Sequence, residues 1–187
     1  MTLVELLLIA FGLSMDAFAV AICTGLAMEK ATLKKSLKVG AYFGVFQAGM
    51  PIIGYCLAML FADKITAYDH WIAFALLCFL GVKMIVDSFR KDKCTIGEPS
   101  LKPATMLTLA VATSIDAMAV GASFAFLKVD IVKAIVLIGV STLVISMLGV
   151  KIGNVFGTKL KSKAEAAGGI ILLLIGANIL LSHIGVY

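Results

Sequence analysis

The chain is dominated by six long runs of apolar residues separated by short polar segments. The runs cover residues 3–28, 37–61, 70–89, 104–127, 132–157 and 166–186. Each has about 20 to 26 residues, which is enough for an α-helix to cross the hydrocarbon core of a bilayer. The runs do not alternate apolar and polar positions, so the pattern excludes a transmembrane β-barrel. It predicts an all-α integral membrane protein with six transmembrane helices.

Composition agrees with this pattern and excludes an ordinary soluble protein. Hydrophobic residues make up 61% of the 187 residues and charged residues 14%, against about 25% charged residues in an average soluble domain. A soluble protein of this size has no means of burying so much apolar surface. The net charge of +5 does not indicate nucleic-acid binding, because the cationic residues lie in short connections between apolar runs. The expected partner is the lipid bilayer.

The cationic residues are distributed unevenly among the connections. The first, third and fifth connections carry eleven Lys and Arg residues, whereas the second and fourth together carry three. Cationic loops tend to stay on the cytoplasmic side of a membrane. We therefore expect a multi-pass protein of the plasma membrane, with the odd-numbered connections in the cytoplasm and both termini outside.

The four cysteines do not indicate disulfide or zinc chemistry. No two of them form a C-x-x-C pair, and Cys23, Cys56 and Cys78 lie within apolar runs. Neither a disulfide framework nor a thiolate zinc site is expected.

A short motif occurs twice. Residues 14–20 read Ser-Met-Asp-Ala-Phe-Ala-Val and residues 114–120 read Ser-Ile-Asp-Ala-Met-Ala-Val, with five of seven positions identical. This predicts two three-helix repeats, 1–90 and 104–187, joined by a cytoplasmic connector at 91–103. Because three is odd, the second repeat crosses the membrane in the opposite sense. Such inverted repeats are typical of secondary transporters, whose sites lie near the midplane where the repeats meet.

Each copy of the motif places one aspartate, Asp16 or Asp116, near the centre of an apolar run. A carboxylate at that depth costs several kcal/mol unless it is paired, hydrated or protonated. Two converging carboxylates would be neutralised together by one divalent cation, and oxygen ligands favour hard ions such as Mg²⁺, Ca²⁺ and Mn²⁺. The alternative is that each aspartate is a protonated group that hydrogen-bonds neighbouring helices.

Other polar residues within the runs are candidates for the remaining ligands of such an ion. Side-chain oxygens are available from Ser14, Ser114, Gln47 and Asn178. For Gln47 and Asn178, a hydrogen bond between helices is an equally good explanation.

Lys83 and Asp87 lie four residues apart in the third run. That spacing allows an ordinary ion pair on one helix face. The functional interpretation is that Lys83 serves as the counter-ion of the empty acidic site and is displaced or deprotonated when metal binds.

The sequence contains no motif for ATP hydrolysis, dinucleotide binding, zinc proteolysis or serine proteolysis. We therefore expect a protein that is not an enzyme and that needs no cofactor. No feature specifies an oligomeric state.

Together with the doubled aspartate motif, three further segments resemble the MntP family of manganese efflux pumps, which is related to the lysine exporter superfamily. They are Phe43–Gln47 with Pro51, His70–Phe74 and Leu80–Ile85. The resemblance covers nearly the whole chain. It implies Mn²⁺ export across the plasma membrane, Asp16 and Asp116 as the transport carboxylates, and secondary roles for Lys83 and Asp87. Some members carry Glu where this chain has Gln47.

These considerations lead to a mechanistic hypothesis. Asp16 and Asp116 bind Mn²⁺ as transported substrate, the two halves expose the site alternately, and protons exchange for the metal on the same aspartates. One alternative is an exporter of another cation or of an amino acid on the same scaffold. Another is a membrane scaffold that transports nothing.

Overall fold

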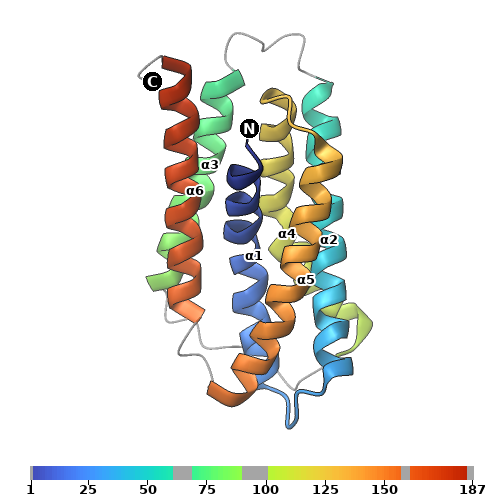
Figure 1. Cartoon of the computed structure of the whole chain (residues 1–187). Coiled ribbons are helices and arrows are strands. Elements are labelled where there is room, and N and C mark those ends of the chain that lie inside the picture. Colours follow the sequence, from blue (N-terminus) through green and yellow to red (C-terminus); the bar gives the residue numbers. More distant parts are fainter. Residues whose placement is uncertain (1, 61–68, 90–100, 157–160, 185–187) are drawn as a thin grey trace.

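The described part of the chain forms a bundle of six α-helices and contains no strand (Figure 1). The computed structural model describes residues 2–60, 69–89, 101–156 and 161–184. The helices are α1 (Leu3–Leu26), α2 (Leu33–Met59), α3 (Asp69–Phe89), α4 (Pro103–Phe126), α5 (Ile131–Phe156) and α6 (Lys161–Ile184). The predicted all-α architecture is confirmed.

Four of these helices, α1, α2, α4 and α5, are long and apolar enough to cross a membrane. The other two contain shorter apolar segments, Trp71–Val86 in α3 and Glu165–Leu181 in α6. Large apolar side chains also cover the outside of the bundle, where Val45, Phe79 and Leu174 are 66–69% exposed. Such a surface is stable in lipid and not in water. The chain is therefore a multi-pass membrane protein.

Polar residues at the helix starts fix where two of the helices begin. Thr2 and Glu5 form a capping box at α1, with the Thr2 backbone N–H donating to the Glu5 carboxylate at 2.8 Å. Before α5, Asp130 accepts hydrogen bonds from the backbone N–H groups of the first turn. The Lys133 ammonium, 3.0 Å from Asp130, holds the pKa of that carboxyl below its usual value.

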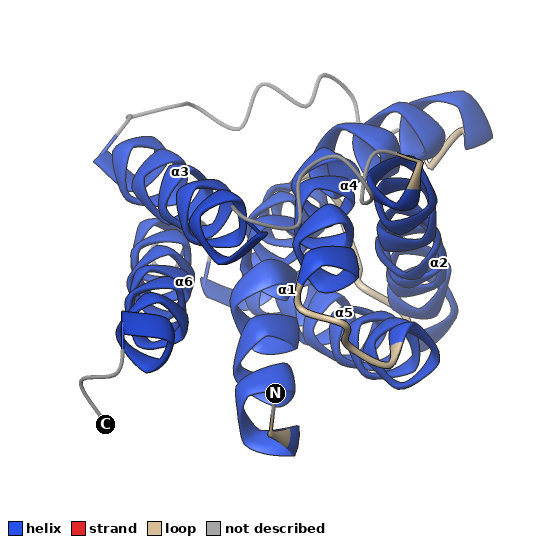
Figure 2. Ribbon diagram, turned by 90° about the horizontal axis from the view of Figure 1, so that it is seen from above, coloured by secondary structure: helices blue, strands red, loops and turns tan. Residues whose placement is uncertain are grey.

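The helices alternate in direction along the chain, so that α1, α3 and α5 run one way and α2, α4 and α6 the other (Figure 1). The most extensive contacts join helices of different halves: α1 with α5, α2 with α4, α3 with α6, and α2 with α5. Seen from above, α3 and α6 lie side by side on one flank, while α1 lies between them and the group of α2, α4 and α5 (Figure 2). The two halves are thus interleaved.

Glycines allow direct backbone-to-backbone contact in the two most extensive helix pairs, α1 with α5 and α2 with α4. A Cβ atom on Gly25 of α1 would lie 2.0 Å from the Val150 carbonyl oxygen of α5. A Cβ atom on Gly121 of α4 would lie 2.1 Å from the Pro51 carbonyl oxygen of α2. No side chain fits at either position, so both crossings require glycine.

Two sequence-based expectations differ from the structure. Helix α6 begins at Lys161, five residues before the predicted run at 166–186, because the polar residues at its start are compatible with a helix that extends beyond the apolar segment. The second difference is at Cys23, which is disulfide-bonded although the sequence did not indicate a disulfide framework. Its partner lies outside the described residues.

Candidate functional site

Two aspartates from different halves of the chain meet at one lysine. The Lys83 ammonium on α3 donates a hydrogen bond to Asp116 Oδ2 on α4 at 3.2 Å and lies 3.9 Å from Asp16 Oδ2 on α1, so the two carboxylate oxygens are no more than about 7 Å apart. Each aspartate is 13 residues from the first residue of its helix and 10 from the last. The repeated motif therefore places both carboxylates at the same mid-helix depth.

Burial differs sharply among the three side chains. Asp116 is 3% exposed, Asp16 21% and Lys83 42%. The second carboxylate oxygen of Asp116, Oδ1, is buried and has no hydrogen-bond partner among the described residues. An unpaired buried carboxylate oxygen is costly, and a cation is the ligand that would satisfy it. Lys83 neutralises part of the charge but leaves this acceptor open.

Gln47 of α2 offers two further oxygens, of which the side-chain oxygen has no hydrogen-bond partner among the described residues. Its side chain is fully buried and donates through Nε2 to the Leu13 carbonyl oxygen at 3.0 Å, while Oε1 has no partner in the described part of the chain. Four residues later comes Pro51, which has no N–H to donate to the main-chain carbonyl of Gln47. Because α2 and α4 run the same way and Pro51 packs on Gly121, Gln47 lies at roughly the depth of Asp116.

The two motif serines are engaged in other hydrogen bonds. Ser14 bonds the Ala10 carbonyl oxygen at 2.6 Å and the Thr142 hydroxyl of α5 at 2.9 Å. Ser114 donates to the Ala110 carbonyl oxygen at 2.6 Å. Ser14 therefore links α1 to α5, whereas the Ser114 hydroxyl is bonded within α4.

Asn178 lies away from the aspartates. Its Nδ2 donates to the Glu5 carboxylate at 3.0 Å, near the start of α1. Asp16 is 11 residues further along that helix, about 16 Å at the rise of an α-helix. We therefore do not include Asn178 in the site.

The expected ion pair of Lys83 with Asp87 involves the Asp87 side chain, which lies outside the described side chains.

Glu165 of α6 is a residue of this region that sequence analysis missed. Its side chain is buried, with 9% of the residue exposed, and Gly168, three residues further along α6, packs on Met15 of α1 and Met84 of α3, which are the chain neighbours of Asp16 and Lys83. The predicted run began at residue 166, which placed Glu165 in a connection. The signal in the sequence is the Gly168–Gly169 pair that follows, because such small residues mark a buried helix face.

The site as a whole offers a divalent ion two carboxylates, with Lys83 held between them. The described residues include no group of three or more His, Cys, Asp or Glu side chains already arranged to hold a metal ion. Carboxylate and amide oxygens are donors suited to hard cations. The arrangement fits binding of a cation in exchange for Lys83 better than nucleophilic or redox chemistry.

Comparison with known proteins gives a consistent result. The family model described as "Putative manganese efflux pump" (Mntp) matches residues 30–180. Curated proteins carrying that description are similar to this chain over nearly their full lengths. They include proteins from Desulfitobacterium hafniense (56% identity, 97% of this chain and 95% of the relative), Mannheimia succiniciproducens (52%, 98% and 98%) and Acetivibrio thermocellus (50%, 100% and 94%). No solved structure matches the chain.

Proposed function

The chain belongs to the MntP family, and from that membership we propose that it exports Mn²⁺ through the site formed by Asp16 and Asp116. One observation carries the proposal: carboxylates from two helices of opposite direction lie within 4 Å of the same ammonium group. A divalent cation in place of that ammonium would contact both carboxylates at once. Gln47 supplies additional oxygen ligands from α2.

Helix pairing supports an inverted repeat. In such a repeat α1 corresponds to α4, α2 to α5 and α3 to α6, so exchanging the two halves replaces each helix by its counterpart. The exchange converts the α1–α5 contact into the α4–α2 contact and the α1–α6 contact into the α4–α3 contact, while α3–α6 and α2–α5 are unchanged. Contacts related in this way are what two inverted copies packed about a twofold axis produce. The two copies rock about the shared site and expose it to each side in turn.

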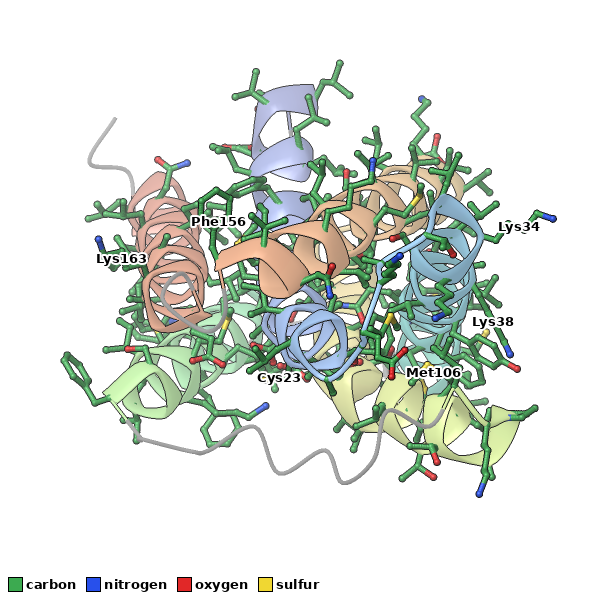
Figure 3. The ribbon with its side chains drawn as sticks, turned by 90° about the horizontal axis from the view of Figure 1, so that it is seen from below. Cys23, Lys34, Lys38, Met106, Phe156 and Lys163 are labelled. Atoms are coloured by element: carbon green, nitrogen blue, oxygen red, sulfur yellow. The ribbon has the colours of Figure 1, made fainter. Side chains whose placement is uncertain are left out.

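Orientation follows from the charged end of the bundle. At the end where α1, α3 and α5 finish, Lys34, Lys38 and Lys163 project from the rim (Figure 3). By the positive-inside rule this end faces the cytoplasm, and both termini face outward.

Proton exchange is the coupling that this site suggests. Moving a dication outward against an inside-negative potential costs about 4.6 kcal/mol per 100 mV, twice the single-charge value. The same two aspartates bind either the metal or protons, so inward proton movement drives metal release outside. During metal binding Lys83 leaves the carboxylates and returns when the site empties.

The test is Mn²⁺ uptake into everted membrane vesicles that carry wild-type protein, Asp16→Asn or Asp116→Asn. Either substitution is expected to abolish Mn²⁺ uptake and the accompanying pH change, with the protein still present in the membrane. Asp130→Asn is the matched control, because Asn also caps a helix and this residue is exposed. Normal Mn²⁺ uptake by both mid-helix variants would reject the proposal, and uptake of other cations or amino acids would reassign the substrate.

A further inference from the structure

The outer surface of α5 carries an open groove in the second half of the helix. Its volume is about 170 Å³, and its walls are formed by Val144, Met147, Leu148 and Lys151. These residues follow one another at intervals of three and four positions, so they lie on one face of α5. Val144 and Leu148 are 49% and 51% exposed. The groove therefore opens toward the lipid, with apolar walls and a single ammonium group.

Helix α2 packs directly on the part of α5 that forms the groove. A Cβ atom on Gly40 of α2 would lie 2.7 Å from the Leu143 carbonyl oxygen and 2.9 Å from Met147 Cγ. Because glycine has no side chain, α2 approaches the turn that carries Met147 closely. The wall at Met147 is thus supported by a second helix.

Lys151 marks the end of the groove that is nearer to the aqueous phase. It lies five residues before Phe156, the last residue of α5, which is about 7.5 Å along the helix axis. Its side chain is exposed, and the described residues place no carboxylate in a salt bridge with it. A lysine at this depth extends its ammonium toward the headgroups. Val144 is seven residues, about 10 Å, deeper in the hydrocarbon.

Further cationic residues follow at the same end of the bundle. Asn154, three residues after Lys151, accepts from the Ala31 N–H at 3.3 Å and donates to the Met28 carbonyl oxygen at 2.7 Å. These bonds hold the connection between α1 and α2 against the end of α5. That connection and the first turn of α2 carry three lysines and one carboxylate, namely Lys30, Lys34, Lys35 and Glu29. The excess of positive charge is complementary to an anionic group.

We propose that the groove binds one anionic phospholipid, with an acyl chain against Val144 and Leu148 and the phosphate at Lys151. Basic sites at the rim of a membrane protein recognise anionic headgroups in this way. A zwitterionic lipid fills the same apolar walls but gains less from the ammonium, so the site is selective for charge. The proposal does not depend on which ion the protein transports.

The test compares phosphatidylglycerol with phosphatidylethanolamine of the same acyl chains, using native mass spectrometry of the purified protein. Wild type is expected to retain phosphatidylglycerol about fivefold more strongly, which is the contribution of one lysine near an anionic headgroup. Lys151→Gln is expected to lose this preference, and Lys151→Arg to keep it. Leu148→Trp fills the groove at an exposed position and is expected to lose the preference although Lys151 remains. Lys163→Gln is the matched control, because it removes a cation from the same end of the bundle on α6 (Figure 3).

Thermal unfolding in detergent provides an independent measurement. Phosphatidylglycerol is expected to raise the melting temperature of wild type and of Lys163→Gln by a few degrees, but not that of Lys151→Gln. Equal retention of the two lipids by wild type, or an unchanged preference in Lys151→Gln, would overturn the proposal. Stabilisation by glycerol phosphate alone would show a site for a free anion instead of a lipid. Conversion of a wild-type dimer to a monomer by Leu148→Trp would show that a second copy covers this face.

Discussion

Lys83 donates its hydrogen bond to Asp116 across a steep difference in exposure. The ammonium and carboxylate are 3.2 Å apart, yet the lysine side chain is 42% exposed and the aspartate 3%. The lysine therefore reaches a buried carboxylate from an accessible position. The Lys83 ammonium is therefore able to move away from Asp116 toward the accessible side while the aspartate stays buried.

The first prediction concerns the stability that this contact provides. Lys83→Gln is expected to lower the free energy of unfolding of the metal-free protein by about 1–2 kcal/mol. That is less than the loss of a fully buried ion pair, because Lys83 is partly exposed to screening. Saturating Mn²⁺ is expected to recover the loss, since ligand binding stabilises the folded state. Thermal unfolding in detergent with and without Mn²⁺ measures both effects.

Lys34→Gln is the control for this change, because Lys34 is exposed at the rim of the bundle. It is expected to unfold as wild type in both conditions. If Lys83→Gln without metal is as stable as wild type, Lys83 is not the counter-ion of the empty site.

A second prediction tests the close helix crossings. Gly121→Ala places a methyl group 2.1 Å from the Pro51 carbonyl oxygen, so α2 and α4 have to separate. The expected loss of stability is about 1–3 kcal/mol, with a parallel loss of transport. Gly49→Ala is a matched control on α2, where an added Cβ meets nothing within 4 Å. It is expected to be neutral or to stabilise by up to about 1 kcal/mol, since Ala favours helix. Equal effects of the two substitutions on thermal unfolding would contradict this packing.

The third prediction concerns a clamp at the end of α1. Asn154 of α5 donates to the Gly25 and Met28 carbonyl oxygens at 3.1 and 2.7 Å, and accepts from the Ala31 N–H at 3.3 Å. These bonds satisfy backbone groups that a helix end leaves open. Asn154→Ala is expected to cost about 1–3 kcal/mol and to increase amide exchange around residues 25–31.

Asn178→Ala is the comparison for the clamp, because Asn178 makes its hydrogen bond with Glu5 at an exposed position. A loss of at most about 1 kcal/mol is expected there. Unchanged amide exchange at residues 25–31 in Asn154→Ala would show that the clamp does not hold the connection between α1 and α2.

The sequence was most informative where one physical requirement applied to a whole segment. In lipid every backbone polar group has to be satisfied within the segment, so an apolar run of about 20 residues is a helix whatever its neighbours are. The repeated motif gave the positions of Asp16 and Asp116 for a similar reason. Equal depth in two related helices follows from the spacing of the motif alone, and the structure brings both side chains to one lysine.

Tertiary neighbours were harder to predict, because a mid-run position does not reveal which face of a helix is buried. Asn178 occupies such a position but lies against Glu5, whereas Glu165 was assigned to a connection although its side chain is buried. The pairing of Lys83 with Asp116 depends on how α3 packs against α4, and no local pattern encodes that packing.

The last prediction distinguishes a metal ligand from a structural hydrogen bond at Gln47. Gln47→Leu removes the buried oxygen that has no partner and retains most of the side-chain volume. The lost bond from Nε2 to the Leu13 carbonyl is expected to cost about 1 kcal/mol or less, because that carbonyl lies within a helix. Mn²⁺ affinity is expected to fall about tenfold, since one oxygen ligand is missing.

Thr142→Val is the control for Gln47→Leu, because it is expected to change stability and not Mn²⁺ affinity. It removes the interhelical bond between Thr142 and Ser14 but leaves the oxygens of Gln47, Asp16 and Asp116 in place. It is expected to lower stability by about 1–2 kcal/mol with Mn²⁺ affinity unchanged. Calorimetric Mn²⁺ titration and thermal unfolding of the two variants measure affinity and stability separately. A Gln47→Leu protein that is destabilised but binds Mn²⁺ normally would identify Gln47 as a hydrogen-bonding residue of the bundle. Loss of a metal ligand would instead lower the affinity for Mn²⁺.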